Sequence, residues 1–426
     1  MLRSCSATLA LRGKPALCLL SQSRWLTTET TKDPGLGLAS PDKNLVILGS
    51  GWAATSLIKY MDARKWKTVT VVSPRNYFLF TPLLPGVTVG TNEPRSIIEP
   101  VRHMLLRHRG AGVDFLEAKA EDIDLQKKVI TLSDCSNVPT EKPRKVPFDT
   151  LVVTVGATSA TFGTPGVREN AHFLKEIPDA LRIRTKIIDA FESANISEDT
   201  KEIDRLLHFV VVGGGPTGVE FAAELRDFIY EEVTHLYPRV VARARVTLIN
   251  AMGHLLNTYD VRISEYCAKT FGRNEINVLK NTLVTAVGEK ELTVKDVQNP
   301  EKTTTIPFSV CVWAAGLAPQ DFTCKISEKL GDAQKRKGLL ETDEYLRVLG
   351  AEDYMYALGD CSSVRRPEIS KVAKELFEEC DTDKNGTVDF SEFRRALEIL
   401  NKKYPQVDYT MEKAKDEFMR EAFKKA

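Results

Sequence analysis

The stretch Leu45-Val46-Ile47-Leu48-Gly49-Ser50-Gly51-Trp52-Ala53-Ala54 decides the fold, because it joins an apolar run to a glycine-rich turn and the start of a helix. The apolar run predicts a buried parallel strand. Gly49 allows a tight turn, Gly51 lets the backbone approach a pyrophosphate, and Ala54 keeps the helix close to the strand. The helix expected from Ala53 to about Met61 would point its free N–H groups at the phosphates.

A second copy of this pattern follows the strand Phe209-Val210-Val211-Val212 and reads Gly213-Gly214-Gly215-Pro216-Thr217-Gly218. Gly213, Gly215 and Gly218 take the places of the three small residues of the first copy, and a helix is expected from Val219 to about Ile229. A glycine-rich turn without a ligand can explain one such motif alone. Two copies in register with strands favour a flavoenzyme with one domain for FAD and one for a nicotinamide cofactor.

Length and composition limit the number of domains, the kinds of partner and the cellular compartment only broadly. A chain of 426 residues has room for two or three domains. The formal net charge of +1 suggests no nucleic-acid partner. The eight cysteines form no CxxC pair and no metal-ligand spacing, which is typical of a reducing compartment. No run of 18 apolar residues occurs, so no membrane-spanning helix is expected.

The N-terminus has the composition of a mitochondrial transit peptide. Residues 1–28 contain Arg3, Arg12, Lys14 and Arg24, several leucines and hydroxyl residues, and no acidic residue before Glu29. A merely disordered tail is the alternative, and a secretory signal is disfavoured because basic residues interrupt the apolar stretch. Residues 29–43 are expected to be a linker.

Strand and helix patterns alternate along the rest of the chain, which predicts an α/β fold of two doubly wound, Rossmann-like dinucleotide-binding domains. Strands are expected at 68–72, 113–116, 128–132 and 150–156, with a helix at about 177–193. The second unit continues with strands at 245–249 and 310–316, and the chain returns to the first unit with a strand at 355–360.

Two residues at strand ends depart from the usual dinucleotide pattern. A carboxylate normally follows the second strand and binds the ribose hydroxyls, but Ser73 stands there in the first unit. Asn250 stands there in the second unit. Asparagine keeps the hydrogen bonds and removes the repulsion of a 2′-phosphate, and no arginine lies between Ala251 and Asn257. The sequence therefore predicts tolerance of NADPH beside NADH.

The loop Asp381-Thr382-Asp383-Lys384-Asn385-Gly386-Thr387-Val388-Asp389-Phe390-Ser391-Glu392 matches an EF-hand at every liganding position. Oxygen ligands stand at the required places, and glycine allows the sharp turn. The predicted Ca²⁺ ligands are Asp381, Asp383, Asn385, Thr387 through its backbone carbonyl, Asp389 and Glu392. Magnesium or a structural role is the alternative to calcium sensing. The stretch 408–426 is either a helix of an incomplete second EF-hand or a basic helix at a membrane surface.

The chain resembles the type II NAD(P)H:quinone dehydrogenases, and its EF-hand resembles that of their calcium-binding mitochondrial subgroup. The resemblance spans residues 44–362 and is carried by the stretches 49–59, 73–90 (SPRNYFLFTPLLPGVTVG), 155–167, 211–225, 313–316 and 356–360. It implies a disulfide-reductase-like flavoprotein with an FAD-binding domain at 44–200 and 320–366. An NAD(P)H-binding domain would be inserted at 201–319, and the EF-hand and a C-terminal helix would occupy 367–426.

The resemblance also implies roles for individual residues. Thr81 and Pro82 would lie near the flavin ring, and Asp360 would bind the ribityl or pyrophosphate part of FAD. Glu220 would lie beside the nicotinamide, although an ordinary acid in the first turn of a helix explains it equally well. The FAD pyrophosphate would be held by Gly49, Gly51 and Ala54, with Ser73 in place of the acid, and NAD(P)H by Gly213, Gly215, Gly218, Asn250 and Gly316.

The activity implied is hydride transfer from NAD(P)H to FAD and electron transfer to ubiquinone without proton pumping. The implied location is the inner mitochondrial membrane surface, on the intermembrane-space side, and a homodimer is left open. Relatives of this kind continue with a quinone-binding and membrane-anchoring segment that we do not find here, so a longer natural chain is expected. A soluble diaphorase-like flavoprotein and a non-catalytic calcium-binding pseudoenzyme are the alternatives.

Overall fold

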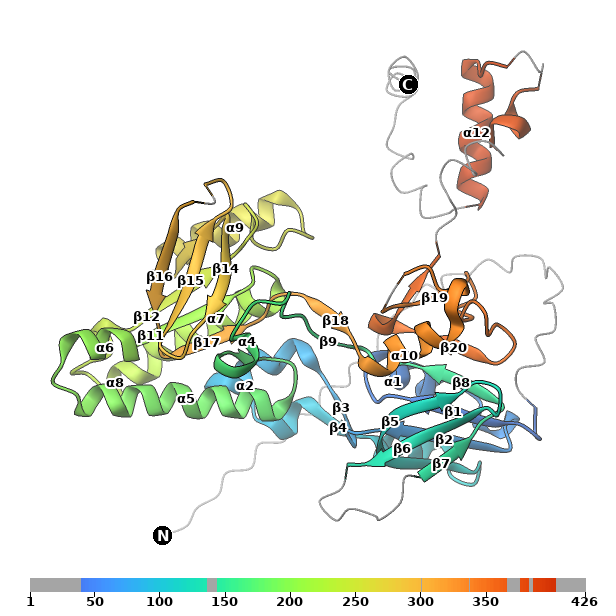
Figure 1. Cartoon of the computed structure of the whole chain (residues 1–426), viewed down its shortest axis with the longest axis horizontal. Helices are drawn as coiled ribbons and strands as arrows, with labels where there is room; N and C mark the ends of the chain where they lie inside the picture. Colours follow the sequence, from blue (N-terminus) through green and yellow to red (C-terminus); the bar gives the residue numbers. More distant parts are fainter. Residues whose placement is uncertain are drawn as a thin grey trace, which may run out of the picture.

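The computed structural model describes residues 40–135, 144–299, 301–336, 338–365, 376–382 and 386–403. The main part of the chain forms two lobes, each built around a parallel sheet, and Figure 1 shows them side by side. The predicted transit peptide at 1–28 and the predicted helix at 408–426 lie outside the described residues.

A seven-stranded sheet forms the first lobe, in the order β20-β8-β1-β2-β5-β6-β7. Strands from β20 to β5 run parallel, whereas β6 and β7 pair antiparallel beyond the second half of β5. The strands are β1 (Asn44–Leu48), β2 (Thr68–Ser73), β5 (Val113–Asp124), β6 (Val129–Asp134), β7 (Arg144–Pro147), β8 (Thr150–Val153) and β20 (Met355–Ala357).

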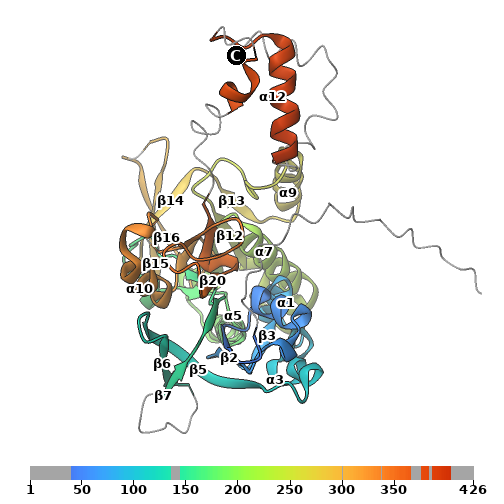
Figure 2. The same ribbon diagram turned by 90° about the vertical axis from the view of Figure 1, so that its right-hand side faces the viewer.

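Helices cover both faces of this sheet (Figure 2). Because side chains alternate along a strand, Leu45 and Ile47 pack towards α1 (Trp52–Tyr60) and α3 (Val101–Leu105). Val46 and Leu48 pack on the other face, in a core that includes Phe322 of α10. That face also carries the small elements of the return segment, namely α10 (Asp321–Leu330), β19 (Leu340–Thr342) and β21 (Ser362–Val364).

The second lobe contains a five-stranded parallel sheet in the order β10-β17-β11-β12-β13. The strands are β10 (His172–Phe173), β11 (His208–Val212), β12 (Arg245–Ile249), β13 (Asn277–Leu279) and β17 (Val310–Trp313). One face is covered by helices and the other by an antiparallel three-stranded sheet. The helices are α5 (Ile177–Ile196), α6 (Thr200–Leu206), α7 (Pro216–Phe228), α8 (Thr234–Leu236) and α9 (Val261–Arg273). The three-stranded sheet consists of β14 (Thr282–Val287), β15 (Glu291–Asp296) and β16 (Thr303–Pro307). The short helix α4 (Val167–Asn170) packs in the same core as this sheet.

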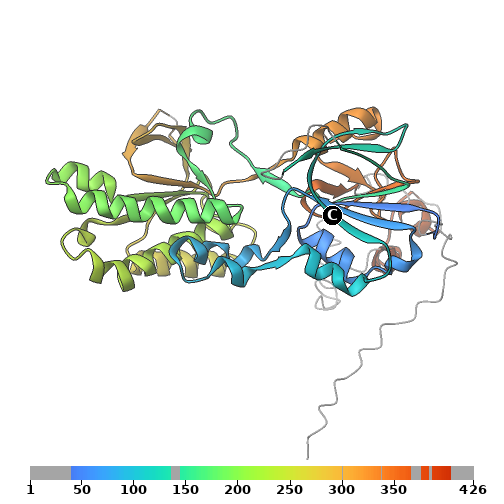
Figure 3. The ribbon, with the colours of Figure 1, turned by 90° about the horizontal axis from the view of Figure 1, so that it is seen from below.

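Two pairs of short strands connect the lobes, as Figure 3 shows from below. In one crossing the chain leaves the first lobe through β3 (Tyr77–Leu79) and returns to it through β4 (Ile98–Pro100). These two strands pair antiparallel. Between them lies α2 (Leu84–Val89), whose six residues are all buried; Leu84, Val87 and Val89 belong to the hydrophobic core formed with α5 and α7. The other crossing pairs β9 (Ala157–Ser159) with β18 (Leu317–Pro319).

The division between the lobes differs from the boundary at residue 200 expected from the sequence. Ile183 and Ile187 of α5 belong to the same core as Phe209 of β11, and β10 pairs with β17. The whole of α5 is therefore part of the second lobe, and the chain crosses at β9 rather than after residue 200. The apolar face of α5 was visible in the sequence, but the sheet that covers it was not.

The EF-hand segment follows the return strand. Residues 376–380 are helical, and α12 (Phe390–Lys403) forms the exiting helix. Gly386 has φ of +77°, the left-handed conformation required at this turn of the loop. Within the described part of the chain, no helix is both long and apolar enough to cross a membrane.

Candidate functional site

The first glycine loop joins β1 to α1 at the carboxyl edge of the first sheet. Gly49 has φ of +117°, and a Cβ atom there would lie 2.3 Å from the carbonyl oxygen of Thr154. Thr154 directly follows β8, the neighbouring strand. Only a residue without a side chain therefore allows the chain to turn so close to β8.

The amino end of α1 is open to a ligand. Gly51 is the N-cap residue, no side chain caps the helix, and no atom within 4 Å would meet a Cβ atom on Gly51. The N–H groups of the first turn thus lack a capping side chain, and free space lies in front of them. This arrangement suits an anionic group such as a pyrophosphate.

A cavity of about 480 Å³ opens at this loop and gathers residues from distant segments. Asp360 lies in the short turn Gly359–Cys361 after β20, where a Cβ atom on Gly359 would lie 3.3 Å from that of Ala53. The return strand thus brings Asp360 to the start of α1. Of the residues predicted to hold FAD, Gly49, Gly51, Ser73, Thr81 and Asp360 line the cavity. Ala54 is buried beneath the helix, and Pro82 is exposed outside the cavity lining.

Ser73 is buried and is bonded to its own loop. Its hydroxyl lies 2.9 Å from the hydroxyl of Ser50 and accepts a hydrogen bond from the backbone N–H of Arg75. The Ser50 hydroxyl also lies 3.0 Å and 3.1 Å from the carbonyl oxygens of Arg75 and Tyr77. The serine in place of the usual acid therefore helps to build the turn 73–77 that forms one wall of the cavity.

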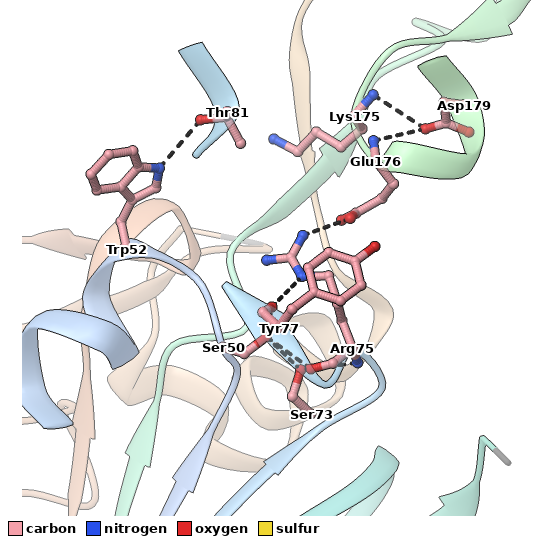
Figure 4. A network of polar contacts seen from close by, with 9 residues as sticks. All are labelled: Ser50, Trp52, Ser73, Arg75, Tyr77, Thr81, Lys175, Glu176 and Asp179. Carbon is pink, nitrogen blue, oxygen red and sulfur yellow. Dashed lines mark hydrogen bonds and ion pairs between the residues drawn. The ribbon is translucent and has the colours of Figure 1, made fainter. Parts of the chain in front are cut away.

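Figure 4 shows a polar network around the cavity that the sequence did not indicate. The Nη1 atom of Arg75 lies 2.6 Å from Oε2 of Glu176, and both residues line the cavity together with Lys175. The indole N–H of Trp52 donates to the Thr81 hydroxyl at 3.2 Å. Arg75 and Glu176 are 101 positions apart, so no local pattern could reveal their pairing.

The second glycine loop repeats the geometry of the first. Gly213 has φ of +120°, and a Cβ atom there would lie 2.6 Å from the carbonyl oxygen of Ala314, just after the neighbouring β17. Gly215 is the N-cap residue of α7, without a capping side chain, and a Cβ atom on it would meet nothing within 4 Å. The second lobe therefore offers a second open helix terminus for an anion.

Glu220 lies one turn further along α7 than expected. The helix begins at Pro216 and has no acidic residue in its first turn, so Glu220 belongs to the second turn. The sequence pattern predicts the helix start at Val219, but the helix begins at Pro216, because proline is favoured at the first helical position. Partial removal of water raises the pKa of the Glu220 carboxyl, and the nearby carboxylate of Glu224 raises it further.

Asn250 is buried at the end of β12 and holds the loop that follows it. Its Nδ2 atom donates to the carbonyl oxygens of Met252 and His254, both at 2.9 Å. A Cβ atom on Gly214 would lie 2.8 Å from Oδ1 of Asn250, so the amide packs directly against the glycine loop. Gly316 lies in the turn between β17 and β18, where a Cβ atom would meet the ring of Phe162 at 2.3 Å.

The EF-hand loop is organised around the carboxylate of Glu392, which is buried. Its Oε1 accepts from the backbone N–H of Thr382 at 2.8 Å, and its Oε2 accepts from that of Asp389 at 3.1 Å. The N–H of Gly386 donates to Oδ2 of Asp381 at 3.0 Å. Among the described residues, no group of three metal-ligating side chains is assembled. Asp383 and Asn385 of the predicted ligand set lie outside the described residues.

Comparison with known proteins agrees with this geometry. The family model of the pyridine nucleotide-disulphide oxidoreductases matches residues 43–375. The chain belongs to this family. The model of the EF-hand domain matches residues 372–400.

Curated relatives of this oxidoreductase are mitochondrial. The external alternative NAD(P)H-ubiquinone oxidoreductase B2 of Arabidopsis thaliana is 42% identical over 86% of this chain and 62% of its own length. The external NADH-ubiquinone oxidoreductase 2 of Saccharomyces cerevisiae is 40% identical over 86% of this chain and 69% of its own. The chain therefore spans somewhat less than two thirds of the Arabidopsis protein.

A solved structure of NDH2 from Plasmodium falciparum in complex with NADH superposes with a TM-score of 0.77, at 31% identity, over 90% of this chain and 77% of that one. These matches confirm the predicted resemblance to the type II dehydrogenases with an EF-hand. They also confirm the predicted fold of two dinucleotide-binding domains with an added EF-hand segment.

Proposed function

We propose that this oxidoreductase takes a hydride from NADH or NADPH onto FAD and passes two electrons to ubiquinone. The observation that supports the proposal most directly is that both lobes contain the same arrangement of loop and helix. Each lobe has a glycine loop at the carboxyl edge of its parallel sheet, followed by a helix terminus that no side chain caps. Because the lobes are joined by two short crossings, the two nucleotides can be held at fixed mutual orientation.

FAD fits the first lobe and a nicotinamide nucleotide fits the second. In the first lobe Gly49 and Gly51 would hold the pyrophosphate, with Asp360 approaching from the return strand and Thr81 further along the cavity. The flavin supplies the chemistry of accepting a hydride and releasing electrons. Gly213, Gly215 and Gly218 would hold the pyrophosphate of NAD(P)H, and Asn250 supports the loop beside the ribose.

Glu220 is proposed to lie beside the nicotinamide, on the side of α7 that also carries Glu224. A carboxyl with a raised pKa can hold a proton closer to neutral pH than an ordinary glutamate does. Gly316 is proposed to act at the edge of the nucleotide site. Its left-handed φ of +70° and close approach to Phe162 shape the point where the chain leaves β17.

The EF-hand is proposed to bind Ca²⁺ through Asp381, Asp383, Asn385, the Thr387 carbonyl, Asp389 and Glu392. A buried glutamate already at the centre of the loop's hydrogen bonds supports this set. A mitochondrial location is supported by the relatives' names. The inner-membrane surface facing the intermembrane space, and a homodimer, are the finer assignments that we propose.

The test uses the purified chain with its bound flavin. We expect a flavin absorbance spectrum that NADH and NADPH bleach without oxygen, and NADH oxidation that depends on a ubiquinone analogue. Reduction of ferricyanide but not of the quinone would indicate a soluble diaphorase instead. A protein without flavin or nucleotide binding would contradict the proposal and leave a non-catalytic calcium-binding protein.

A further inference from the structure

The ion pair between Arg75 and Glu176 connects the two lobes at the edge of the cofactor cavity. Arg75 lies two residues after β2 of the first sheet, immediately before the chain crosses into the second lobe. Glu176 is the N-cap residue of α5, which belongs to the core of the second lobe. The atoms Nη1 and Oε2 are 2.6 Å apart, and both side chains line the cavity.

Each partner is also held by residues of its own chain segment, and the Tyr77 ring beside Arg75 packs against the core of the second lobe. The Nε atom of Arg75 donates to the carbonyl oxygen of Tyr77, and its guanidinium lies over the Tyr77 ring. The backbone carbonyl of Arg75 accepts from the Ser50 hydroxyl and its backbone N–H donates to the Ser73 hydroxyl, so the turn that carries Arg75 is bonded to the glycine loop. On the other side, the backbone N–H of Glu176 donates to Oδ2 of Asp179 in the first turn of α5.

The ion pair lies at the amino end of the long helix α5. A helix of 20 residues is about 30 Å long, and α5 packs along the second lobe through Ile183, Ile187 and Phe191. The same core includes Phe221 and Leu225 of α7, the helix that follows the second glycine loop. Because packed cores shift as units, a displacement at Glu176 would move the nicotinamide site with it.

We propose that Arg75 and Glu176 are a positioning pair that fixes how the nicotinamide site of the second lobe faces the flavin site of the first. The proposal rests on the function proposed above. Hydride transfer needs the reacting atoms about 3 to 3.5 Å apart, and a misplacement of about 1 Å can slow it about 100-fold. The pair would therefore act on the rate of flavin reduction and leave the two glycine loops intact.

The chain offers a matched control. Arg205 and Glu202 form an ion pair at the same 2.6 Å, with side chains 18% and 39% exposed, against 20% and 43% for Arg75 and Glu176. Glu202 and Arg205 both lie within α6, in the second lobe. Glu202→Gln thus removes an ion pair of the same length and exposure without touching the connection between the lobes.

The experiment compares Glu176→Gln, Arg75→Gln, the double variant and Glu202→Gln. For each variant with a full flavin spectrum, the rate constant of flavin bleaching and the apparent Kd for NADH are taken from rapid-reaction measurements. We expect Glu176→Gln to bleach at least about tenfold more slowly with Kd changed less than about twofold. The double variant should be no slower than either single one, and Glu202→Gln should match the wild type.

A second measurement needs no nucleotide. Hydrogen exchange of the crossing strands β9 and β18, in NADH-free protein, should be faster in Glu176→Gln and Arg75→Gln than in Glu202→Gln. If exchange and bleaching in Glu176→Gln equal those of the wild type, the positioning pair is refuted. If the wild type does not bleach with NADH, the proposed function fails, and the exchange result still decides whether the pair connects the lobes.

Discussion

A Cβ atom on Gly218 would lie 2.0 Å from the carbonyl oxygen of Gly213. The first residue of the loop and the helix after it are thus in direct backbone contact, with no room for a methyl group. This contact sets how closely α7 approaches β11 and therefore where the open helix terminus points.

Gly218→Ala should therefore destabilise the second lobe, because the helix must shift to relieve the clash. We expect a loss of about 1 to 3 kcal/mol in unfolding free energy by urea denaturation. Gly215→Ala is the control, since a methyl group there meets no protein atom within 4 Å. It should keep the stability and weaken NADH binding, and equal stability of both variants would contradict the assignment.

Gly51→Val should prevent FAD from binding while the first lobe stays folded. The space in front of Gly51 is free of protein atoms, so the new side chain would fill the place of the pyrophosphate and not clash with the fold. The measurements are the flavin-to-protein absorbance ratio and the far-ultraviolet circular dichroism spectrum. A full flavin content in this variant would show that the loop is not the FAD site.

Asn250→Asp should loosen the loop after β12. The Nδ2 donors to Met252 and His254 would be lost, and a buried carboxylate would face two carbonyl oxygens. An unsatisfied buried polar group costs about 1 to 3 kcal/mol. We expect lower stability and weaker binding of both NADH and NADPH, with the exposed Asn299→Asp as control. Selective loss of NADPH alone would instead support a purely electrostatic role.

His208 should make the stability depend on pH. The side chain is buried between the Pro307 carbonyl oxygen at 2.7 Å and the Thr247 hydroxyl at 2.8 Å. Burial, with a contribution from Arg245, lowers its pKa from 6.5 to about 4. The folded protein therefore keeps His208 neutral where the unfolded chain binds a proton. The contribution of neutral His208 to the free energy of unfolding is complete above pH 6.5 and is lost as the pH falls towards 4.

Between pH 7 and pH 5 the lowered pKa of His208 should reduce the free energy of unfolding by about 2 kcal/mol. Urea unfolding of the wild type and of His208→Gln at both pH values measures it. The fall in unfolding free energy should be smaller by about this amount in the variant. An identical pH dependence in both proteins would show that another group is responsible.

Glu392→Gln should weaken Ca²⁺ binding by about tenfold or more, because the last loop position supplies the bidentate carboxylate. Glutamine keeps the size of the side chain and one oxygen acceptor for Thr382. Titration calorimetry would measure the affinity, with Glu398→Gln on the exposed side of α12 as control. If NADH oxidation does not change with Ca²⁺ in the wild type, the EF-hand has a structural role only.

The sequence by itself determined the two glycine loops, the strands that precede them and the EF-hand loop. These features are local, since each depends on residue types at fixed spacing within a dozen positions. The strand β12 was predicted at its observed bounds, 245–249, and α5 from its first residue, because an apolar run and a 3.6-residue repeat are visible without any partner.

Only the tertiary structure decided which elements share a lobe and which residues meet at the cavity. The assignment of α5 to the second lobe depends on the sheet that buries Ile183. The position of α2 in the second lobe depends on the core that it forms with α5 and α7. The pairing of Arg75 with Glu176 arises where the chain crosses twice between lobes. Such contacts join segments about a hundred residues apart, and their free energy comes from burial that no single segment achieves alone.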